Sequence, residues 1–478
     1  MDRSNGDLGL ALAAFALLSF LSAFGDVRGS VPQVSSNLQC VAVAHCDETA
    51  GDLPQSRTGL VSKFAPHERI AFLGDSITHG GHFIGYLQLF AALRHPGWDV
   101  RLFNVGVSGD DAACGAKRWD WDLKSHAPDR TFVMFGMNDV GRYSYRAPEP
   151  ASKAEADARA KDLADYRRDM GAIADLFAKD GMRGVLLTPS PFDQYSDMEC
   201  ENLAGCNEVA LMAAADIVRR LARERGLGLV EIHAPFTRLL KEHPEMHLCG
   251  SDRVHARELG HLLMAALILE SMGETDLVAS VTVRAKRPDG AEFAYAPRAL
   301  PFPRLPEYEK VDGALFPLTE RFNREMLTVT GLAPGRYDLC FDGECVGTFA
   351  ADELARGVNV ALLDTPNQRL AQETAKLMRQ KVENDRRRRH LVLQYVEFRK
   401  DGISADDFAA QDAQIERRLN KMKAAKSRWY GAHVDMANRY RQDRVHAAQF
   451  DADEKDLLER INAVRPKSAK VTVRRTGK

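Results

Sequence analysis

Residues 69–81 read Arg-Ile-Ala-Phe-Leu-Gly-Asp-Ser-Ile-Thr-His-Gly-Gly, and the rest of the chain can be ordered around this stretch. Its apolar first half predicts a buried strand, and residues 83–93 behind it predict a helix. Ser76 therefore stands at the carboxyl end of a strand, where open α/β sheets carry reactive groups. The N-terminus of the following helix favours negative charge near Ser76. An ordinary strand–helix turn with a serine cap has the same pattern, so this motif alone leaves the function open.

Apolar runs alternate with longer helical patterns from about residue 66 to residue 275. The expected strands are 70–73, 100–105, 131–135, 184–187 and 228–232. The expected helices are 83–93, 112–125, 156–179, 208–224 and 257–272. This alternation predicts an α/β domain with a parallel sheet covered by helices on both faces.

The pattern changes after this domain. Residues 276–365 combine short strand-like runs with turn signals at Pro334-Gly335 and Asp342-Gly343, which predicts a small β-rich module. Residues 366–478 are charged and helical in pattern, and they predict a helical C-terminal region. We favour simple packing of these helices on the body over self-association, although both remain open.

The N-terminus predicts export. Residues 8–24 are apolar, follow Arg3 and end in small residues, which is typical of a signal peptide over residues 1–25. An uncleaved anchor is the alternative, and no later segment is apolar and long enough to span a membrane. Residues 26–65 predict an irregular leader. We therefore expect a secreted or periplasmic protein, and the formal net charge of −2 indicates no nucleic-acid partner.

Four short segments carry the candidate chemistry, and each falls at the end of an expected strand or just before the last helix. They are Gly74-Asp75-Ser76, the stretch 104–110 (Asn-Val-Gly-Val-Ser-Gly-Asp), the stretch 136–139 (Gly-Met-Asn-Asp) and the stretch 252–255 (Asp-Arg-Val-His). The carboxyl ends of parallel strands meet at one edge of a sheet, so these four segments are expected to lie together.

The residue types match a serine nucleophile with its base. Ser76 needs a base to take its proton, and His255 can serve because imidazole titrates near neutrality. Asp252, three residues earlier, can orient the ring and stabilise its protonated form. The backbone N–H groups of Ser76 and Gly109 and the side-chain amide of Asn138 can donate to the oxyanion formed on attack at a carbonyl. This mechanism requires no metal and no cofactor.

These segments resemble the SGNH hydrolase superfamily, also called the GDSL esterases. Ser76, Gly109, Asn138 and the Asp252/His255 pair match its motifs in order, over roughly residues 66–275. The resemblance implies a three-layer α/β/α fold and ester hydrolysis by a serine nucleophile. Ala256 departs from the Pro that many members carry after the histidine.

A second copy of the histidine motif lies at residues 443–447, where Asp-Arg-Val-His-Ala is repeated letter for letter. It falls in the charged helical region, whereas the first copy follows a strand, so we favour His255 over His446. Other candidates have plain structural alternatives. His79 and His82 can line the pocket or simply begin a helix. Trp119, Trp121 and Tyr143 can stack on a sugar ring or pack in the core. Asp110, Asp111 and Asp139 form no loop of the EF-hand type.

Three functions compete on this evidence. The favoured one is a secreted serine esterase acting on a small-molecule or carbohydrate ester, and within this class we favour a carbohydrate O-acetyl esterase. A lipolytic or thioester hydrolase with the same residues is the second. A non-catalytic binding or assembly protein is the third, and the presence of Ser76, Asp252 and His255 argues against it.

Eight cysteines follow the N-terminal apolar segment, and an even number in an exported chain predicts disulfides. None shows the Cys-x-x-Cys spacing of a zinc site. Cys340 and Cys345 flank a predicted two-residue hairpin turn, which brings them face to face. Local pairs are expected for Cys40 with Cys46 and for Cys200 with Cys206. Cys114 and Cys249 would then pair across the sheet edge, with two separate buried thiols as the alternative.

Overall fold

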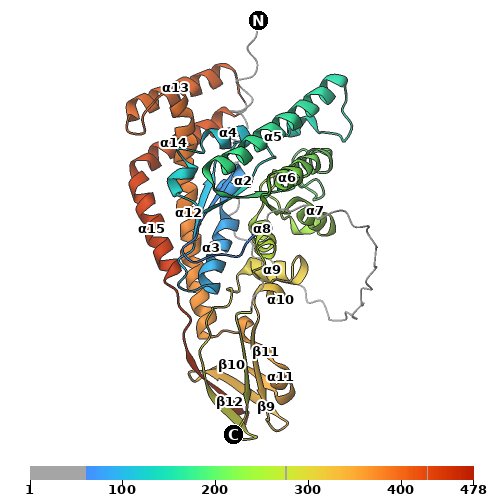
Figure 1. Cartoon of the computed structure of the whole chain (residues 1–478), viewed down its shortest axis with the longest axis vertical. Coiled ribbons are helices and arrows are strands. Elements are labelled where there is room, and N and C mark those ends of the chain that lie inside the picture. Colours follow the sequence, from blue (N-terminus) through green and yellow to red (C-terminus); the bar gives the residue numbers. More distant parts are fainter. Residues whose placement is uncertain (1–60, 275–276, 428, 478) are drawn as a thin grey trace.

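The computed structural model describes residues 61–274, 277–427 and 429–477. The predicted signal peptide, nearly all of the predicted leader and the predicted Cys40–Cys46 bridge lie outside these residues. The described chain has helices and a parallel sheet in its upper part in Figure 1, and a β-rich module at its lower end.

Five parallel strands form the central sheet, in the order β2-β1-β3-β4-β5. They are β1 (Arg69–Gly74), β2 (Arg101–Gly106), β3 (Arg130–Met134), β4 (Arg183–Leu187) and β5 (Gly228–Val230). β1 pairs with β2 and β3, and Gly74 aligns with Gly106 and Met134. The motif-bearing loops after these three strands therefore leave the same edge of the sheet. All five predicted strands are present.

Helices flank the sheet, as expected for an α/β fold. They are α2 (Ser76–Gly80), α3 (His82–Arg94), α4 (Ala112–Lys117), α5 (Lys153–Asp180), α6 (Met212–Arg225), α7 (His233–Glu242) and α8 (Glu258–Ser271). One group packs as α3 with α8, and another as α5 with α4 and α6. α5 begins at the Ser152 cap, whose side chain accepts a hydrogen bond from Glu155 N, and it ends at Gly181 with φ 63°. The α/β fold class is confirmed.

The predicted helix 112–125 is wrong in its second half. α4 ends at Lys117, and the chain then turns so that Arg118 and Trp119 are buried. Arg118 donates to Asp110 and Asp122, and these ion pairs hold the turn. The sequence pattern does not indicate this turn, because the side chain that points inward is Arg118, and a charged residue normally marks an exposed helix face.

A proline-rich segment, residues 297–306, follows the α/β domain and packs against it. α9 (Pro306–Ala314) and α10 (Leu318–Phe322) follow it, and α9 contacts α8. Leu300, Phe302 and Tyr308 belong to the same hydrophobic core as the central sheet. The main core therefore extends well beyond residue 275.

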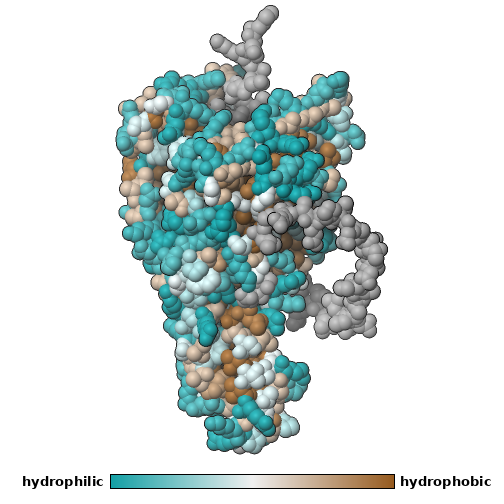
Figure 2. Space-filling model, in the orientation of Figure 1, coloured by the Kyte–Doolittle hydropathy of each residue, from teal (hydrophilic) through white to brown (hydrophobic). Residues whose placement is uncertain are grey.

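The β-rich module contains two small sheets. One has the order β10-β9-β12-β7 and the other has the order β11-β8-β6. Their strands are β6 (Ala279–Arg284), β7 (Gly290–Tyr295), β8 (Glu325–Thr330), β9 (Arg336–Phe341), β10 (Glu344–Ala350), β11 (Val358–Asn359) and β12 (Ala469–Arg475), and α11 (Ala351–Arg356) follows β10. Figure 2 shows hydrophobic residues on this lower part of the visible face, whereas the helical part is mainly hydrophilic.

The hairpin disulfide is confirmed. Cys340 and Cys345 face each other in the β9–β10 pairing and are joined by a disulfide bond. The predicted Cys114–Cys249 and Cys200–Cys206 bridges are wrong, since all four of these cysteines are free. Cys206 and Cys249 are buried within the hydrophobic core. Cys114 instead lies on α4, next to Asp110 and Asp111.

Four helices make up most of the C-terminal region. They are α12 (Pro366–Lys400), α13 (Phe408–Ala424), α14 (Tyr430–Asp443) and α15 (Ala447–Asn462). The region is not helical throughout, because β12 returns to the β-rich module and pairs with β7 and β9. Of the helices in the described residues, none has the length and apolarity needed to cross a membrane.

Candidate active site

Ser76 occupies the first position of α2, directly after β1. The Asp75 side chain caps the helix by accepting a hydrogen bond from Ile77 N at 2.9 Å. Gly74 is needed for this turn, because a Cβ there would lie 2.2 Å from Thr78 Oγ1 and 2.7 Å from the Met134 carbonyl oxygen. Ser76 is largely buried, with 8% of its surface exposed.

His255 lies against Ser76, as the sequence analysis expects. Its Nε2 is 2.7 Å from Ser76 Oγ, and its Nδ1 bonds to Asp252 Oδ2. The carboxylate can only accept from Nδ1–H, so Nε2 is left as the acceptor for the serine proton. The arrangement can therefore draw a proton from Ser76.

Asp252 is held in its charged form. Burial favours the neutral acid, but the nearby His255 and hydrogen bonds to it outweigh burial, so the pKa of Asp252 lies well below its usual range. Oδ1 also accepts from Val254 N at 3.1 Å and from His255 N at 3.0 Å. These bonds fix the carboxylate relative to the imidazole.

Arg253 is a residue that the sequence analysis missed. It has φ 64°, a strained conformation for a side chain of this size, and it is 4% exposed. Its guanidinium donates to four carbonyl oxygens of the loop after β4, those of Asp193, Ser196, Met198 and Cys200. Arg253 thus ties that loop to the Asp252–His255 turn. Its only signal in the sequence was its position between Asp252 and His255.

Asn138 has a fixed side-chain orientation. Its Nδ2 donates to the Asp110 carbonyl at 2.8 Å, and its Oδ1 accepts from Arg142 at 3.0 Å. Nδ2 carries a second hydrogen that this bond does not use. Gly109 has φ 85°, which suits glycine. The oxyanion-donor roles of Asn138, Gly109 and the Ser76 N–H remain predictions.

The neighbouring aspartates have structural partners. Asp139 accepts from Ala112 N and Gly136 N, both at 2.8 Å, and burial raises the pKa of Asp139. Asp111 caps α4 by accepting from Cys114 N, and Asp110 pairs with Arg118. Throughout the described ranges, no group of three or more His, Cys, Asp or Glu residues could hold a metal ion.

Most of the other candidates take structural positions. Trp119 is buried, donates to Asp180 at 2.8 Å and packs edge-on against Phe177, so it is a core residue. Arg399 lies 4.8 Å from the ring centre of Trp121. His79 is buried and bonds to Ser108.

The second histidine motif lies in a different setting. Asp443 pairs with Arg387, and His446 is exposed at the end of a short turn before α15. His446 is therefore available to solvent, whereas His255 bonds to Ser76.

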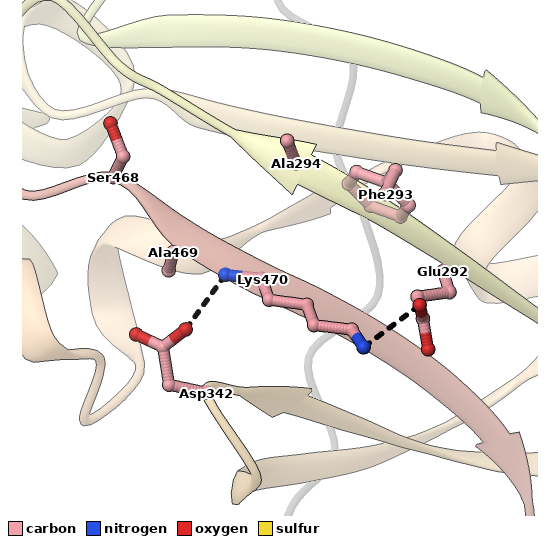
Figure 3. Close-up of a pocket in the computed structure, with 7 residues that line it drawn as sticks. All are labelled: Glu292, Phe293, Ala294, Asp342, Ser468, Ala469 and Lys470. Carbon is pink, nitrogen blue, oxygen red and sulfur yellow. Dashed lines mark hydrogen bonds and ion pairs between the residues drawn. The ribbon is translucent and has the colours of Figure 1, made fainter.

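A surface hollow in the β-rich module has no comparable chemistry (Figure 3). Seven residues of β7, of the β9–β10 turn, of β12 and of the segment just before β12 line it: Glu292, Phe293, Ala294, Asp342, Ser468, Ala469 and Lys470. The Lys470 side chain pairs with Glu292 at 2.8 Å, and its backbone N–H donates to Asp342 at 2.8 Å. The Lys470 ammonium is thus paired with Glu292, and no histidine lines the hollow as a base for Ser468.

Comparisons with known proteins agree with the motifs. Residues 72–263 match the model of the GDSL-like Lipase/Acylhydrolase family. An acetylxylan esterase of Geobacillus stearothermophilus is 25% identical over 230 residues, covering 44% of this chain and 96% of that protein. The solved structure of a gut microbial diltiazem-metabolizing enzyme is 25% identical with a TM-score of 0.75, covering 87% of this chain and all of that one. The resemblance noted in the sequence is confirmed, and carboxylic ester hydrolysis is the activity it supports.

Proposed function

We propose, from the premise that residues 72–263 form a GDSL-like lipase/acylhydrolase domain, that this chain is an exported serine esterase that removes acetyl groups from carbohydrates. The observation that carries the catalytic part is the hydrogen bond of 2.7 Å between Ser76 Oγ and His255 Nε2, with Asp252 on the opposite ring nitrogen.

The mechanism follows from these contacts. Ser76 Oγ bonds to the acetyl carbon while His255 takes the serine proton, and the carbonyl oxygen becomes an oxyanion near Asn138. The oxyanion then collapses, the alcohol leaves, and His255 returns the proton to it. Water repeats the sequence on the acetyl-enzyme, with His255 as base, and releases acetate. Asp252 stabilises the imidazolium in both halves.

The acetyl and carbohydrate assignment rests on one relative and on the N-terminal segment. The acetylxylan esterase relative matches 44% of this chain and is itself covered over 96% of its length. The N-terminal apolar segment favours export, and an exported enzyme can reach polysaccharides outside the cell. Both arguments concern the substrate and not the catalytic residues, so the substrate and the mechanism can be tested apart.

A second candidate substrate is a small drug-like ester. The diltiazem-metabolizing enzyme aligns over 87% of this chain, which extends far beyond residues 72–263 and takes in later parts of the molecule. A likeness of that extent favours testing diltiazem beside the carbohydrate esters.

The deciding experiment is a substrate panel with purified protein. It contains acetylated xylo-oligosaccharides, p-nitrophenyl esters of increasing acyl length, and diltiazem, and Ser76→Ala is run beside the wild type. We expect the highest kcat/KM on acetylated oligosaccharides and a loss of kcat on the order of 10⁶ in Ser76→Ala. A preference for long acyl chains would replace the carbohydrate assignment with a lipolytic one, and turnover by Ser76→Ala close to that of the wild type would refute the mechanism.

A further inference from the structure

Helix α12 comes from outside the matched segment and yet packs beside the nucleophile. It contacts α2, α3 and β2, and in Figure 1 it runs along the sheet domain next to α3. The helices approach closely at Gly85, where a Cβ would lie 2.5 Å from Val382 and 2.7 Å from Met378. Val382 and Met378 also belong to the main hydrophobic core. α12 is therefore built into the body of the domain.

Arg389 on α12 reaches the loop after β2. It is 1% exposed, and its Nε donates to the Gly106 carbonyl at 2.9 Å. Its two terminal nitrogens donate to the two carboxylate oxygens of Asp122 at 2.8 and 2.6 Å. Gly106 is three residues before Gly109, so the contact fixes the start of an expected oxyanion loop.

Arg118 continues this network to the other two loops. Its Nε donates to Asp110 at 2.6 Å, one terminal nitrogen shares Asp122 at 2.7 Å, and the other donates to the Gly74 carbonyl at 3.1 Å. Gly74 precedes Asp75-Ser76, and the carbonyl of Asp110 receives the amide of Asn138. The network thus joins all three segments from which the oxyanion donors come.

A second contact from α12 reaches the same loop through a histidine. His79 Nε2 lies 3.2 Å from the Arg386 carbonyl, and its Nδ1 lies 3.2 Å from Ser108 N. Since the carbonyl can only accept, Nε2 carries the hydrogen and Nδ1 accepts from Ser108. Burial lowers the pKa of His79, which keeps this relay neutral. Ser108 immediately precedes Gly109.

Packing alone does not account for a fully buried guanidinium at this position. Burying an ion pair usually gains little net stability over apolar residues of similar volume. Arg389 instead donates to both carboxylate oxygens of Asp122 and to the backbone carbonyl of Gly106. Its contacts have the form expected of a group that sets loop positions.

We propose that Arg389 is a positioning residue for the oxyanion loops, so that helix α12 is part of the catalytic body although it lies more than a hundred residues beyond the matched segment. The inference rests on the proposed esterase mechanism. It predicts that the charge and the shape of Arg389 both matter to the rate, because a lysine cannot make the bidentate bond to Asp122 and reach Gly106 at once.

The test measures the reaction of Ser76 with a fluorophosphonate probe in the full-length protein. Ser76 Oγ bonds to phosphorus, fluoride leaves and the serine proton passes to His255, while the phosphoryl oxygen occupies the oxyanion position. Arg389→Lys should lower the rate constant of labelling and kcat for p-nitrophenyl acetate by about tenfold or more, with KM within about twofold. Arg387→Lys is the matched control, since Arg387 is a partly exposed neighbour that pairs with Asp443, and both rates should stay within about twofold.

A double variant guards against a folding defect. Asp122→Asn with Arg389→Met removes one negative and one positive charge and leaves Arg118 paired with Asp110, so the buried charges stay balanced. We expect slow labelling of Ser76 in this double variant even if its melting temperature returns to that of the wild type. Wild-type rate constants in a folded Arg389 variant would overturn the inference. So would fewer labelled sites per chain with an unchanged rate constant at those sites, because that result shows a structural role only. Failure of the wild type on every ester but normal labelling of Ser76 would refute the substrate proposal alone, and an unlabelled Ser76 would refute both.

Discussion

Replacing Asn138 with alanine isolates one expected oxyanion donor. Asn138 Nδ2 uses one hydrogen in its bond of 2.8 Å to the Asp110 carbonyl, so one N–H remains for the oxyanion. The Arg142 bond of 3.0 Å to Oδ1 prevents the amide from flipping. Alanine removes this donor and leaves Ser76, His255 and the backbone in place.

Two magnitudes follow from this geometry. Losing a single oxyanion donor lowers kcat by about 10²–10³, or about 2.7–4 kcal/mol of transition-state stabilisation. Losing the two protein hydrogen bonds lowers the free energy of unfolding by about 1–3 kcal/mol. KM should change much less than kcat, because the ester carbonyl bears little charge before attack. Asn138→Asp should be at least as damaging, since an acceptor then faces the oxyanion.

The assay compares steady-state kinetics with thermal unfolding. Asn367→Ala is the control for the loss of two hydrogen bonds, because the Asn367 side chain, like that of Asn138, makes two: it donates to the carbonyl and accepts from the N–H of Lys467, at 3.0 and 2.8 Å. It should lose a similar amount of stability and keep its kcat. If Asn138→Ala raised KM alone, or lost no more kcat than Asn367→Ala, Asn138 would not be an oxyanion donor.

Three further predictions concern the base, its protonation and a buried acid. His255→Ala should abolish turnover almost as fully as loss of the nucleophile, whereas the exposed His446→Ala should be silent; equal losses in both would show that the wrong motif copy was chosen. The logarithm of kcat/KM should fall by about one per pH unit on the acid side, because a protonated His255 cannot accept the serine proton and Asp252 stays ionised there; a profile flat into the acid range would require another base. Burial raises the pKa of Glu325 to about 7, so the folded state keeps a proton that the unfolded chain releases, and stability falls as pH rises from about 4.5 to about 7. Glu325→Gln, which can still accept the bond of 2.6 Å from Tyr295, should therefore gain about 2–3 kcal/mol more relative to wild type at pH 8 than at pH 5 in denaturant titrations, and an equal change at both pH values would contradict the buried neutral acid.

The parts of the fold that depend on local pattern could be predicted from the sequence. Strand positions follow from apolar runs bounded by turns, and the β9–β10 disulfide follows from a two-residue turn that sets its own register. The Cys114–Cys249 pairing fails because knowledge that two loops share a sheet edge does not place two sulfur atoms within bonding distance. β12 was missed because its partners, β7 and β9, lie more than a hundred residues earlier.

The candidate site divides in the same way. Ser76, Asp252 and His255 could be named because each stands in a short motif at a strand end, where topology brings the motifs together. Arg253 and Arg389 could not, because their partners are backbone carbonyls and carboxylates distant in sequence. An arginine in a charged helix has no feature that separates a solvent-exposed face from a fully buried network.

The central claim is that Ser76, activated by His255, is the nucleophile. Peptide mapping after fluorophosphonate labelling tests it most directly, with wild type, Ser76→Ala and His255→Ala run in parallel. The account predicts one adduct, on the peptide containing Ser76, which is absent in Ser76→Ala and forms far more slowly in His255→Ala. An adduct on a different residue, or labelling of Ser76 at the wild-type rate without His255, would contradict it.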